Sequence, residues 1–172
     1  MISKIFKISF HFILLILLQV LIVRNIHLGS FVVLFPYILF ILLLPFETHK
    51  LLVLIISFSI GLVIDMFYDT AGMHASVCTL IGFLRPYIFK ILSPREGYEP
   101  ELIPNVHSMG STWFITYSAI MIFIHHLVFF YLEIFRFNEF STTFLRVILS
   151  SIGTFCFVYV VQFLFYKTDK NT

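Results

Sequence analysis

Charged side chains are scarce in this sequence of 172 residues. Asp, Glu, Lys and Arg make up 12% of it, about half of the share that a soluble domain carries. Glycine is also rare at 7 residues, whereas hydrophobic residues make up 60% and include 23 phenylalanines. These proportions exclude an ordinary soluble domain and predict a surface that mostly faces lipid. The apolar runs are continuous rather than alternating, which favours helices over a barrel, so we expect an all-α integral membrane protein.

Motifs for common chemistry are missing as well. The net charge is only +2, and no basic aromatic patch or phosphate-binding loop is present, so nucleic acid is not an expected partner. Cys78 and Cys156 both lie within apolar runs, where thiols behave as small apolar groups, and they indicate neither a disulfide nor a metal. Without a serine elbow or a histidine pair at helical spacing, we expect neither an enzyme nor a cofactor.

Six apolar runs predict about six transmembrane helices in a single polytopic membrane domain over residues 1–172, without a soluble domain. The predicted spans are 8–23, 30–46, 51–68, 73–92, 112–135 and 143–166. The second span contains Pro36 and would be about 25 Å long as a helix, so we expect it to be kinked or nearly upright. Residues 93–111 form the one long loop, which holds three of the six prolines.

The distribution of basic residues orients these spans. Six spans place both termini on the same side of the membrane. With the termini inside, seven basic residues lie on the inner side and three on the outer side. The inner set is Lys4, Lys7, Lys50, Lys90, Arg95, Lys167 and Lys170, and the outer set is Arg24, Arg136 and Arg146. The positive-inside rule therefore predicts cytoplasmic termini and a cytoplasmic 93–111 loop.

A short polar joint between the third and fourth spans holds the most unusual residues of the chain. It contains Asp65, Asp69, Gly72 and His74, and Gly61 lies one helical turn earlier. Carboxylates beside the hydrocarbon region are costly, so they usually have a partner or a function. A metal or catalytic carboxylate pair is one interpretation, but no third ligand or nucleophile is suitably spaced. We favour a helix-packing or partner-interaction motif formed by these five residues.

Small residues form a stripe on each of the two spans that meet at this joint. Ser57, Gly61 and Asp65 recur every four residues and share one face of the third span. The stripe of the fourth span is made of Ala71, Ala75, Cys78, Gly82 and Arg85. Small faces let helices approach closely, so we expect these spans to pack through them, against each other or against the first and sixth spans. The sixth span offers a further small patch, Ser150, Ser151, Gly153 and Thr154.

Arg85 lies within the fourth span, roughly 20 Å deeper than the polar joint along a helix. It should therefore not contact Asp65, which we expect to pair with Arg24 or Arg146 at its own level. Two interpretations of Arg85 stay open. Its side chain either snorkels to the inner headgroups or contacts an anionic lipid or substrate.

His125 and His126 are adjacent polar residues in the fifth span. A proton relay that includes Glu133 is one interpretation, but adjacent helical positions point to different sides and do not form one chelate. We favour neutral histidines that hydrogen-bond across helices.

The sequence GLVIDMFYDTAGMHA, followed by a span that ends in RPYIFKILSPREGYEP, resembles the rod shape-determining protein MreD family. Gly61, Leu62, Asp65 and Gly72 match the positions most characteristic of that family, and a small residue, Ala75, follows them. The length, the six-span layout and the absence of a soluble domain also fit. The SPREGYEP loop and the histidine pair of the fifth span resemble the Bacteroidota branch of the family.

This resemblance implies a non-enzymatic component of the cell-elongation machinery in the bacterial cytoplasmic membrane. Members of the family are partners of MreC. They act with the actin-like MreB, the glycosyltransferase RodA and a class B penicillin-binding protein to direct side-wall peptidoglycan synthesis. The resemblance also implies a fold distantly similar to the substrate-binding subunits of energy-coupling factor vitamin transporters, and Asp65 would then be a fold or contact residue. Contacts with membrane lipids and with further copies of the chain are additional expectations.

Two other functions remain alternatives. A vitamin-type transporter subunit that binds a small molecule is the main one. Such subunits dock on their partner through alanines spaced four apart in the first span, whereas this chain has only three alanines and none there. A membrane-embedded enzyme that uses Asp65, Asp69 and the histidines would need a polar cavity joining groups on different helices.

Overall fold

The computed structural model describes residues 13–25, 31–100, 102–134 and 140–165, and all regular structure in these ranges is helical. The elements are η1 (Leu18–Ile22, π-helical), η2 (Val23–Asn25, 3₁₀), α2 (Ile38–Leu42), α3 (Lys50–Tyr68), α4 (Met73–Ile91), α5 (Val106–Met109), α6 (Ser111–Ile134) and α7 (Phe140–Phe165). An α-helical turn over residues 13–17 precedes η1. The predicted span ends at 8–12, 135 and 166 lie outside the described residues, as do Arg136 and the basic residues of both termini.

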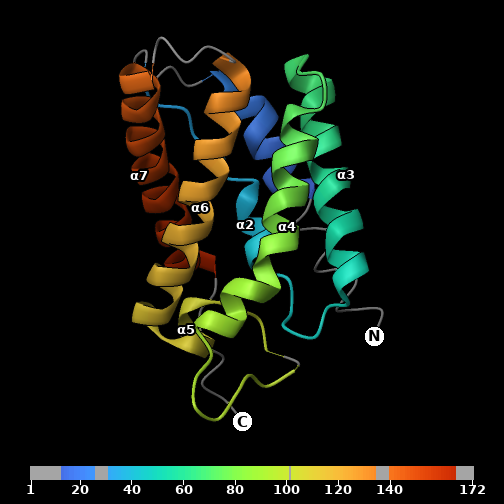
Figure 1. The fold of residues 1–172 in the computed structure, drawn as a ribbon, viewed down its shortest axis with the longest axis vertical. Helices are drawn as coiled ribbons and strands as arrows, with labels where there is room; N and C mark the ends of the chain where they lie inside the picture. The colour runs from blue at the N-terminus through green and yellow to red at the C-terminus, as the bar shows by residue number, and fades with distance from the viewer. Residues whose placement is uncertain (1–12, 26–30, 101, 135–139, 166–172) are drawn as a thin grey trace.

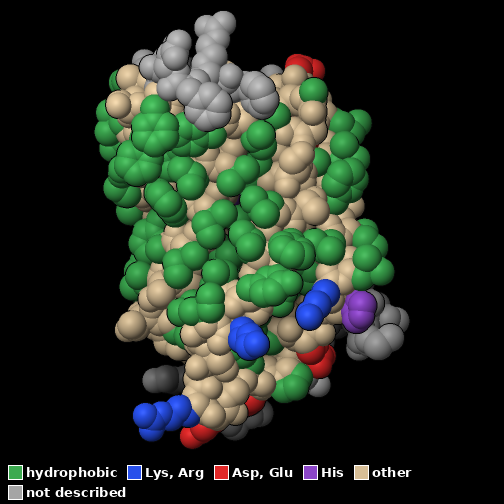
Figure 2. Space-filling view, viewed as in Figure 1, with side chains coloured by type: hydrophobic (Ala, Val, Ile, Leu, Met, Phe, Trp, Pro, Cys, Tyr) green, Lys and Arg blue, Asp and Glu red, His purple; other side chains and the backbone are tan. Residues whose placement is uncertain are grey.

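Two pairs of long helices flank the short helix α2. Figure 1 shows α3 beside α4 on one side, α6 beside α7 on the other, and α2 between the pairs. By length and composition, α3, α6 and α7 are long and apolar enough to cross a membrane. In Figure 2, hydrophobic side chains cover most of the visible face, and charged side chains gather mainly at its lower end. The described part of the protein is therefore all-helical, with several helices suited to lipid, and α3, α4 and α6 start within one residue of the predicted positions.

The second predicted span is the main correction to the expected fold. The described residues of this span, 31–46, do not form one continuous helix, because the chain has no regular structure over 32–35, turns at Pro36 and Tyr37, and then forms only the five-residue helix α2. Every side chain from Phe35 to Leu44 is nevertheless buried. This apolar run is therefore the centre of the protein rather than a lipid-facing helix.

Polar side chains of distant helices satisfy the non-helical backbone before α2. The Val33 N–H donates to Ser150 Oγ (3.0 Å), and the Phe35 N–H donates to Thr154 Oγ1 (3.1 Å). Gln19 Nε2 donates to the Leu34 carbonyl (3.2 Å) from the first helix. Irregular backbone at membrane depth is tolerated only when the protein supplies such partners. The small-residue patch of α7 therefore contacts this segment, whereas the sequence offered it as a packing face for α3 or α4.

The two small-residue stripes bring α3 and α4 together, as the sequence predicts. A Cβ atom added to Gly61 would collide with the backbone of His74 and Ala75, and one added to Gly82 would contact Ser57 Oγ and Val53. The helices join through a tight turn in which Asp69 (φ 54°) and Gly72 (φ 82°) both adopt left-handed backbone conformations. Ala71 lies exposed in this turn and takes no part in the packed stripe.

The predicted 93–111 loop contains α5, and most of its described residues are exposed although 104–106 are buried. Asn105 caps that helix by accepting a hydrogen bond from the Ser108 N–H (2.8 Å). The Tyr98 hydroxyl donates to the Phe89 carbonyl (2.9 Å) and accepts from Trp113 Nε1 (3.2 Å), which holds the loop against α4 and α6. Partial burial raises the pKa of Tyr98 above its usual value.

Candidate functional site

Asp65 acts as a helix cap supplied from the neighbouring helix. Its carboxylate accepts hydrogen bonds from the His74 N–H at Oδ1 (3.0 Å) and from the Ala75 N–H at Oδ2 (2.9 Å). The Thr70 hydroxyl also donates to Oδ1. Gly72, the residue before α4, has no side chain to cap these N–H groups. A carboxylate at this position also interacts favourably with the partial positive charge of the helix N-terminus, so Asp65 fastens the start of α4 to α3.

The expected pairing of Asp65 with Arg146 is not found. The Arg146 guanidinium instead forms an ion pair with Glu133 (Nη1 to Oε2, 2.9 Å), and its Cζ lies 4.5 Å from the centre of the Phe130 ring. The other expected partner, the Arg24 side chain, lies outside the described part of the structure. Among the described residues, backbone N–H groups and the Thr70 hydroxyl supply the hydrogen bonds of the Asp65 carboxylate.

The five residues of the predicted motif have different roles. Gly61, Asp65 and His74 are buried at the contact between α3 and α4, and Gly72 supplies the positive φ at the start of α4. Asp69 is exposed and ends α3, so it does not share a buried environment with Asp65. The structure therefore brings four of the five together as a packing unit and leaves Asp69 at the surface.

His74 belongs to a buried polar cluster that includes Tyr37. The Tyr37 hydroxyl lies 2.7 Å from His74 Nδ1 and 2.9 Å from His125 Nε2, and all three side chains are fully buried. This link connects α4 and α6 through the turn before α2. Tyr37 is not among the residues predicted from the sequence, although a tyrosine in an apolar run that also contains a proline is a signal for a buried hydrogen bond.

His126 makes a separate connection across helices. Its Nε2 lies 3.0 Å from Thr154 Oγ1 on α7, and its Nδ1 lies 2.9 Å from the Ile122 carbonyl. The two adjacent histidines therefore hydrogen-bond to different elements, as predicted. Glu133 is exposed and paired with Arg146, so it does not contribute to a relay with either histidine.

Arg85 turns inward, which excludes the snorkelling interpretation. Its side chain is only 2% exposed, and its Nη2 donates to the Leu44 carbonyl and to the Pro45 carbonyl (3.3 Å) beyond the end of α2. Its Cζ also lies 4.5 Å from the centre of the Phe89 ring. Both carbonyls belong to the segment that follows α2, so the guanidinium fixes this segment to α4.

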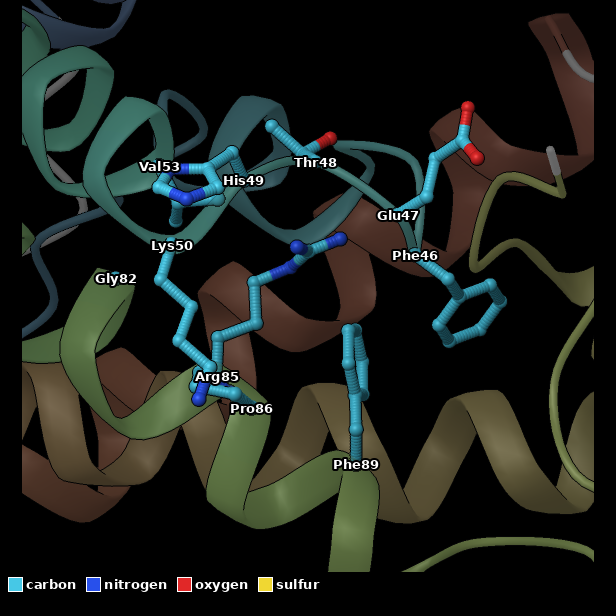
Figure 3. A pocket seen from close by; sticks show the side chains of 10 residues that line it. All are labelled: Phe46, Glu47, Thr48, His49, Lys50, Val53, Gly82, Arg85, Pro86 and Phe89. Atoms are coloured by element: carbon cyan, nitrogen blue, oxygen red, sulfur yellow. The ribbon is translucent and has the colours of Figure 1, made fainter. Parts of the chain in front are cut away.

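A cavity of about 480 Å³ lies beside the Arg85 side chain. One wall is the turn from Phe46 to Lys50 with the start of α3, and the other is a face of α4 from Gly82 to Phe89. Figure 3 shows the Arg85 guanidinium projecting from α4 toward the 46–50 turn. The cavity lies at the end of the α3–α4 pair opposite to Asp65, because α4 runs about 16 Å from His74 to Arg85.

No family model, curated protein or solved structure matches this chain. Functional interpretation therefore depends on the residues and their geometry. Within the described residues, no group of three or more His, Cys, Asp or Glu side chains is arranged to hold a metal ion. In the part of the chain that the structure describes, Asp65 and Arg85 are buried charged residues: Asp65 is enclosed by hydrogen-bond donors of the chain, and Arg85 lies beside a cavity.

Proposed function

We propose that this chain is a non-enzymatic membrane scaffold of the bacterial cell-elongation complex, related to the MreD family. In this role it regulates cell shape and side-wall peptidoglycan synthesis through contacts with an MreC-like protein, RodA and a class B penicillin-binding protein, and with MreB directly or indirectly. The proposal places the chain in the cytoplasmic membrane with six crossings and cytoplasmic termini. The second crossing is then the broken segment around α2.

The observation that carries the proposal is the use of the Asp65 carboxylate. Both of its oxygens accept hydrogen bonds from the chain itself, and Gly61 lets the start of α4 lie directly against α3. Gly61 and Asp65 are two of the residues on which the resemblance to the MreD family depends, and here they join two closely packed helices. A motif that shapes a surface suits a scaffold better than it suits a catalyst.

One observation favours the transporter alternative. The cavity beside Arg85 has a volume within the range of about 300–1,000 Å³ that is common for small-molecule sites. A vitamin-type substrate-binding subunit would be expected to carry such a cavity. The missing alanine pattern of the first span still argues against that function.

Affinity purification from native membranes tests the proposal. The tagged full chain would be extracted in mild detergent, and the proteins and small molecules recovered with it would be quantified by mass spectrometry. We expect recovery of an MreC-like protein or of the elongation synthases. Recovery of an energy-coupling subunit with its ATPases, or of a bound vitamin, would instead support the transporter function.

A matched pair of variants links this experiment to the motif. Asp65→Asn replaces one carboxylate oxygen by an amide that cannot accept from both N–H groups of α4, so we expect less of the MreC-like partner to be recovered. Asp69→Asn removes the same charge four residues away at an exposed position that tolerates positive φ. Equal recovery with both variants and the unmodified chain would contradict a role for the motif in assembly.

A further inference from the structure

The positive charge of Arg85 has no negative partner within the described part of the chain. No carboxylate there forms an ion pair with it, and its Nε is buried without a hydrogen-bond partner. Glu47 lines the same cavity, but Figure 3 shows its carboxylate directed away from the guanidinium. A buried charge is normally paired, because removing it from water without compensation is costly. Two backbone carbonyls, the Tyr117 hydroxyl and the Phe89 ring are neutral groups and offset only part of this cost.

The start of α3 adds further positive potential to the cavity. The helix has 19 residues, its preceding residue His49 makes no capping hydrogen bond through its side chain, and its first turn contains no acidic residue. The first N–H groups of such a helix lack partners within the helix and carry partial positive charge. An uncapped helix N-terminus beside a buried guanidinium is a favourable place for an anion.

Lys50 and the apolar residues around it indicate where the anion comes from. Lys50 lines the cavity and is exposed at the first position of α3, where basic residues meet headgroups. Leu51, Leu52 and Tyr87 are exposed next to the cavity-lining residues Lys50 and Pro86. Both helices therefore offer apolar surface directly beside the cavity, against which the acyl chains of a lipid can pack.

We propose that the cavity between the start of α3 and α4 binds the phosphate group of an anionic phospholipid. The phosphate contacts Arg85, Lys50 and the free N–H groups at the start of α3, and the glycerol end lies against Pro86 and Phe89. This lipid links the broken segment around α2 to the α3–α4 pair, because Arg85 contacts both. The inference does not depend on the proposed role in cell elongation.

Titration of the purified full chain in delipidating, charge-neutral detergent tests this site. The probes are dihexanoyl phosphatidylglycerol, dihexanoyl phosphatidylcholine and inorganic phosphate, with binding followed by native mass spectrometry. We expect phosphatidylglycerol to bind at one site and to exceed both other probes. Arg85→Gln should weaken it about tenfold or more, because a hydrogen-bonded charge pair is lost. Lys50→Gln should weaken it about fivefold through the loss of one interfacial charge.

Lys90→Gln is the matched control. It removes the same charge from an exposed position in the last turn of α4, at the same end of the helix pair but outside the cavity. Equal weakening in Lys90→Gln and Lys50→Gln would overturn the proposal in favour of unspecific attraction. If phosphatidylcholine binds as tightly as phosphatidylglycerol, the site does not require an anionic lipid and the proposal is wrong. If inorganic phosphate binds as tightly as phosphatidylglycerol, the site recognises free phosphate and not a lipid. Because Lys50 is exposed, its variant keeps the test decisive if Arg85→Gln does not fold.

Discussion

Each end of the α3–α4 pair holds one buried charged residue, but the surroundings of these two residues differ. At one end, Asp65 is 5% exposed and surrounded by hydrogen-bond donors of its own chain. At the other end, Arg85 is 2% exposed and has a cavity, a buried Nε without a partner and two backbone carbonyls. From the sequence, burying the charge of Asp65 and burying that of Arg85 look equally costly. In the structure, only Arg85 lies beside a cavity that can hold a ligand.

The comparison teaches that a buried charge indicates function only when the fold has not already neutralised it. The hydrogen bonds of Asp65 account for its presence, so it needs no ligand. Arg85 also holds the segment after α2, but its contacts are with neutral groups, namely two carbonyls, the Tyr117 hydroxyl and the Phe89 ring, and its charge has no carboxylate partner among the described residues. The following variants test this difference, from the largest expected effect to the smallest.

Gly61→Leu should abolish the native packing of α3 against α4 at the end of the pair that contains Asp65. Any side chain at this position collides with the backbone of α4 rather than with a flexible group, so the helices must separate. We expect a loss of at least about 3 kcal/mol, seen as aggregation in size-exclusion chromatography and loss of a cooperative thermal transition. Ser59→Leu, at an exposed position of the same helix, should leave both measurements unchanged.

Asp65→Ala should destabilise the protein by about 3 kcal/mol, because the buried N–H groups of His74 and Ala75 lose their acceptor. Thermal unfolding in detergent measures the loss, and amide hydrogen exchange at the start of α4 locates it. Asp69→Asn is the control, since this exposed residue accepts no such bonds in the structure. Unchanged exchange at His74 in Asp65→Ala would contradict the capping role.

Arg85→Lys should lower stability by about 1 kcal/mol in lipid-free detergent. Lysine keeps the charge but cannot match the planar, forked geometry with which the guanidinium reaches the carbonyls after α2 and covers Phe89. Arg95→Lys makes the same change in the exposed loop and should have no effect. Identical unfolding of both variants would restore the snorkelling interpretation of Arg85.

Glu47→Gln should have the smallest effect and the opposite sign. Glu47 is the one carboxylate that lines the cavity, so its removal should strengthen phosphatidylglycerol binding by about twofold to fivefold without altering the fold. Glu99→Gln removes the same charge from an exposed loop position outside the cavity. A stronger increase in Glu99→Gln would show that overall charge, rather than the cavity, controls lipid binding.

Much of the helical framework could be predicted because its signals are local. Apolar runs between polar residues mark α3, α6 and α7, since lipid accepts only segments that satisfy their own backbone. The four-residue spacing of Ser57, Gly61 and Asp65 similarly predicted the face through which α3 meets α4. That spacing lies within one helix and needs no knowledge of the rest of the chain.

The broken segment before α2 could not be predicted in this way. Its N–H groups are satisfied by Ser150 and Thr154, which lie 117 and 119 residues away from their partners in the sequence. An apolar run that is buried by other helices has the same composition as one that crosses lipid alone. Pro36 indicated a break, but the length of non-helical chain depends on acceptors that only α7 provides.

The sequence by itself determined that the described part of the protein is all-helical, because scarce charge and continuous apolar runs favour long apolar helices, three of which are suited to cross a membrane. It also predicted the small-residue faces of α3 and α4, but the fold decided that these faces meet each other, with Gly61 directly against the backbone of α4. The tertiary structure alone decided what each charged residue contacts. The partners of Asp65 lie 5 to 10 residues further along the chain, whereas the carbonyls that Arg85 contacts lie 40 and 41 residues earlier, and only the fold places a cavity beside Arg85.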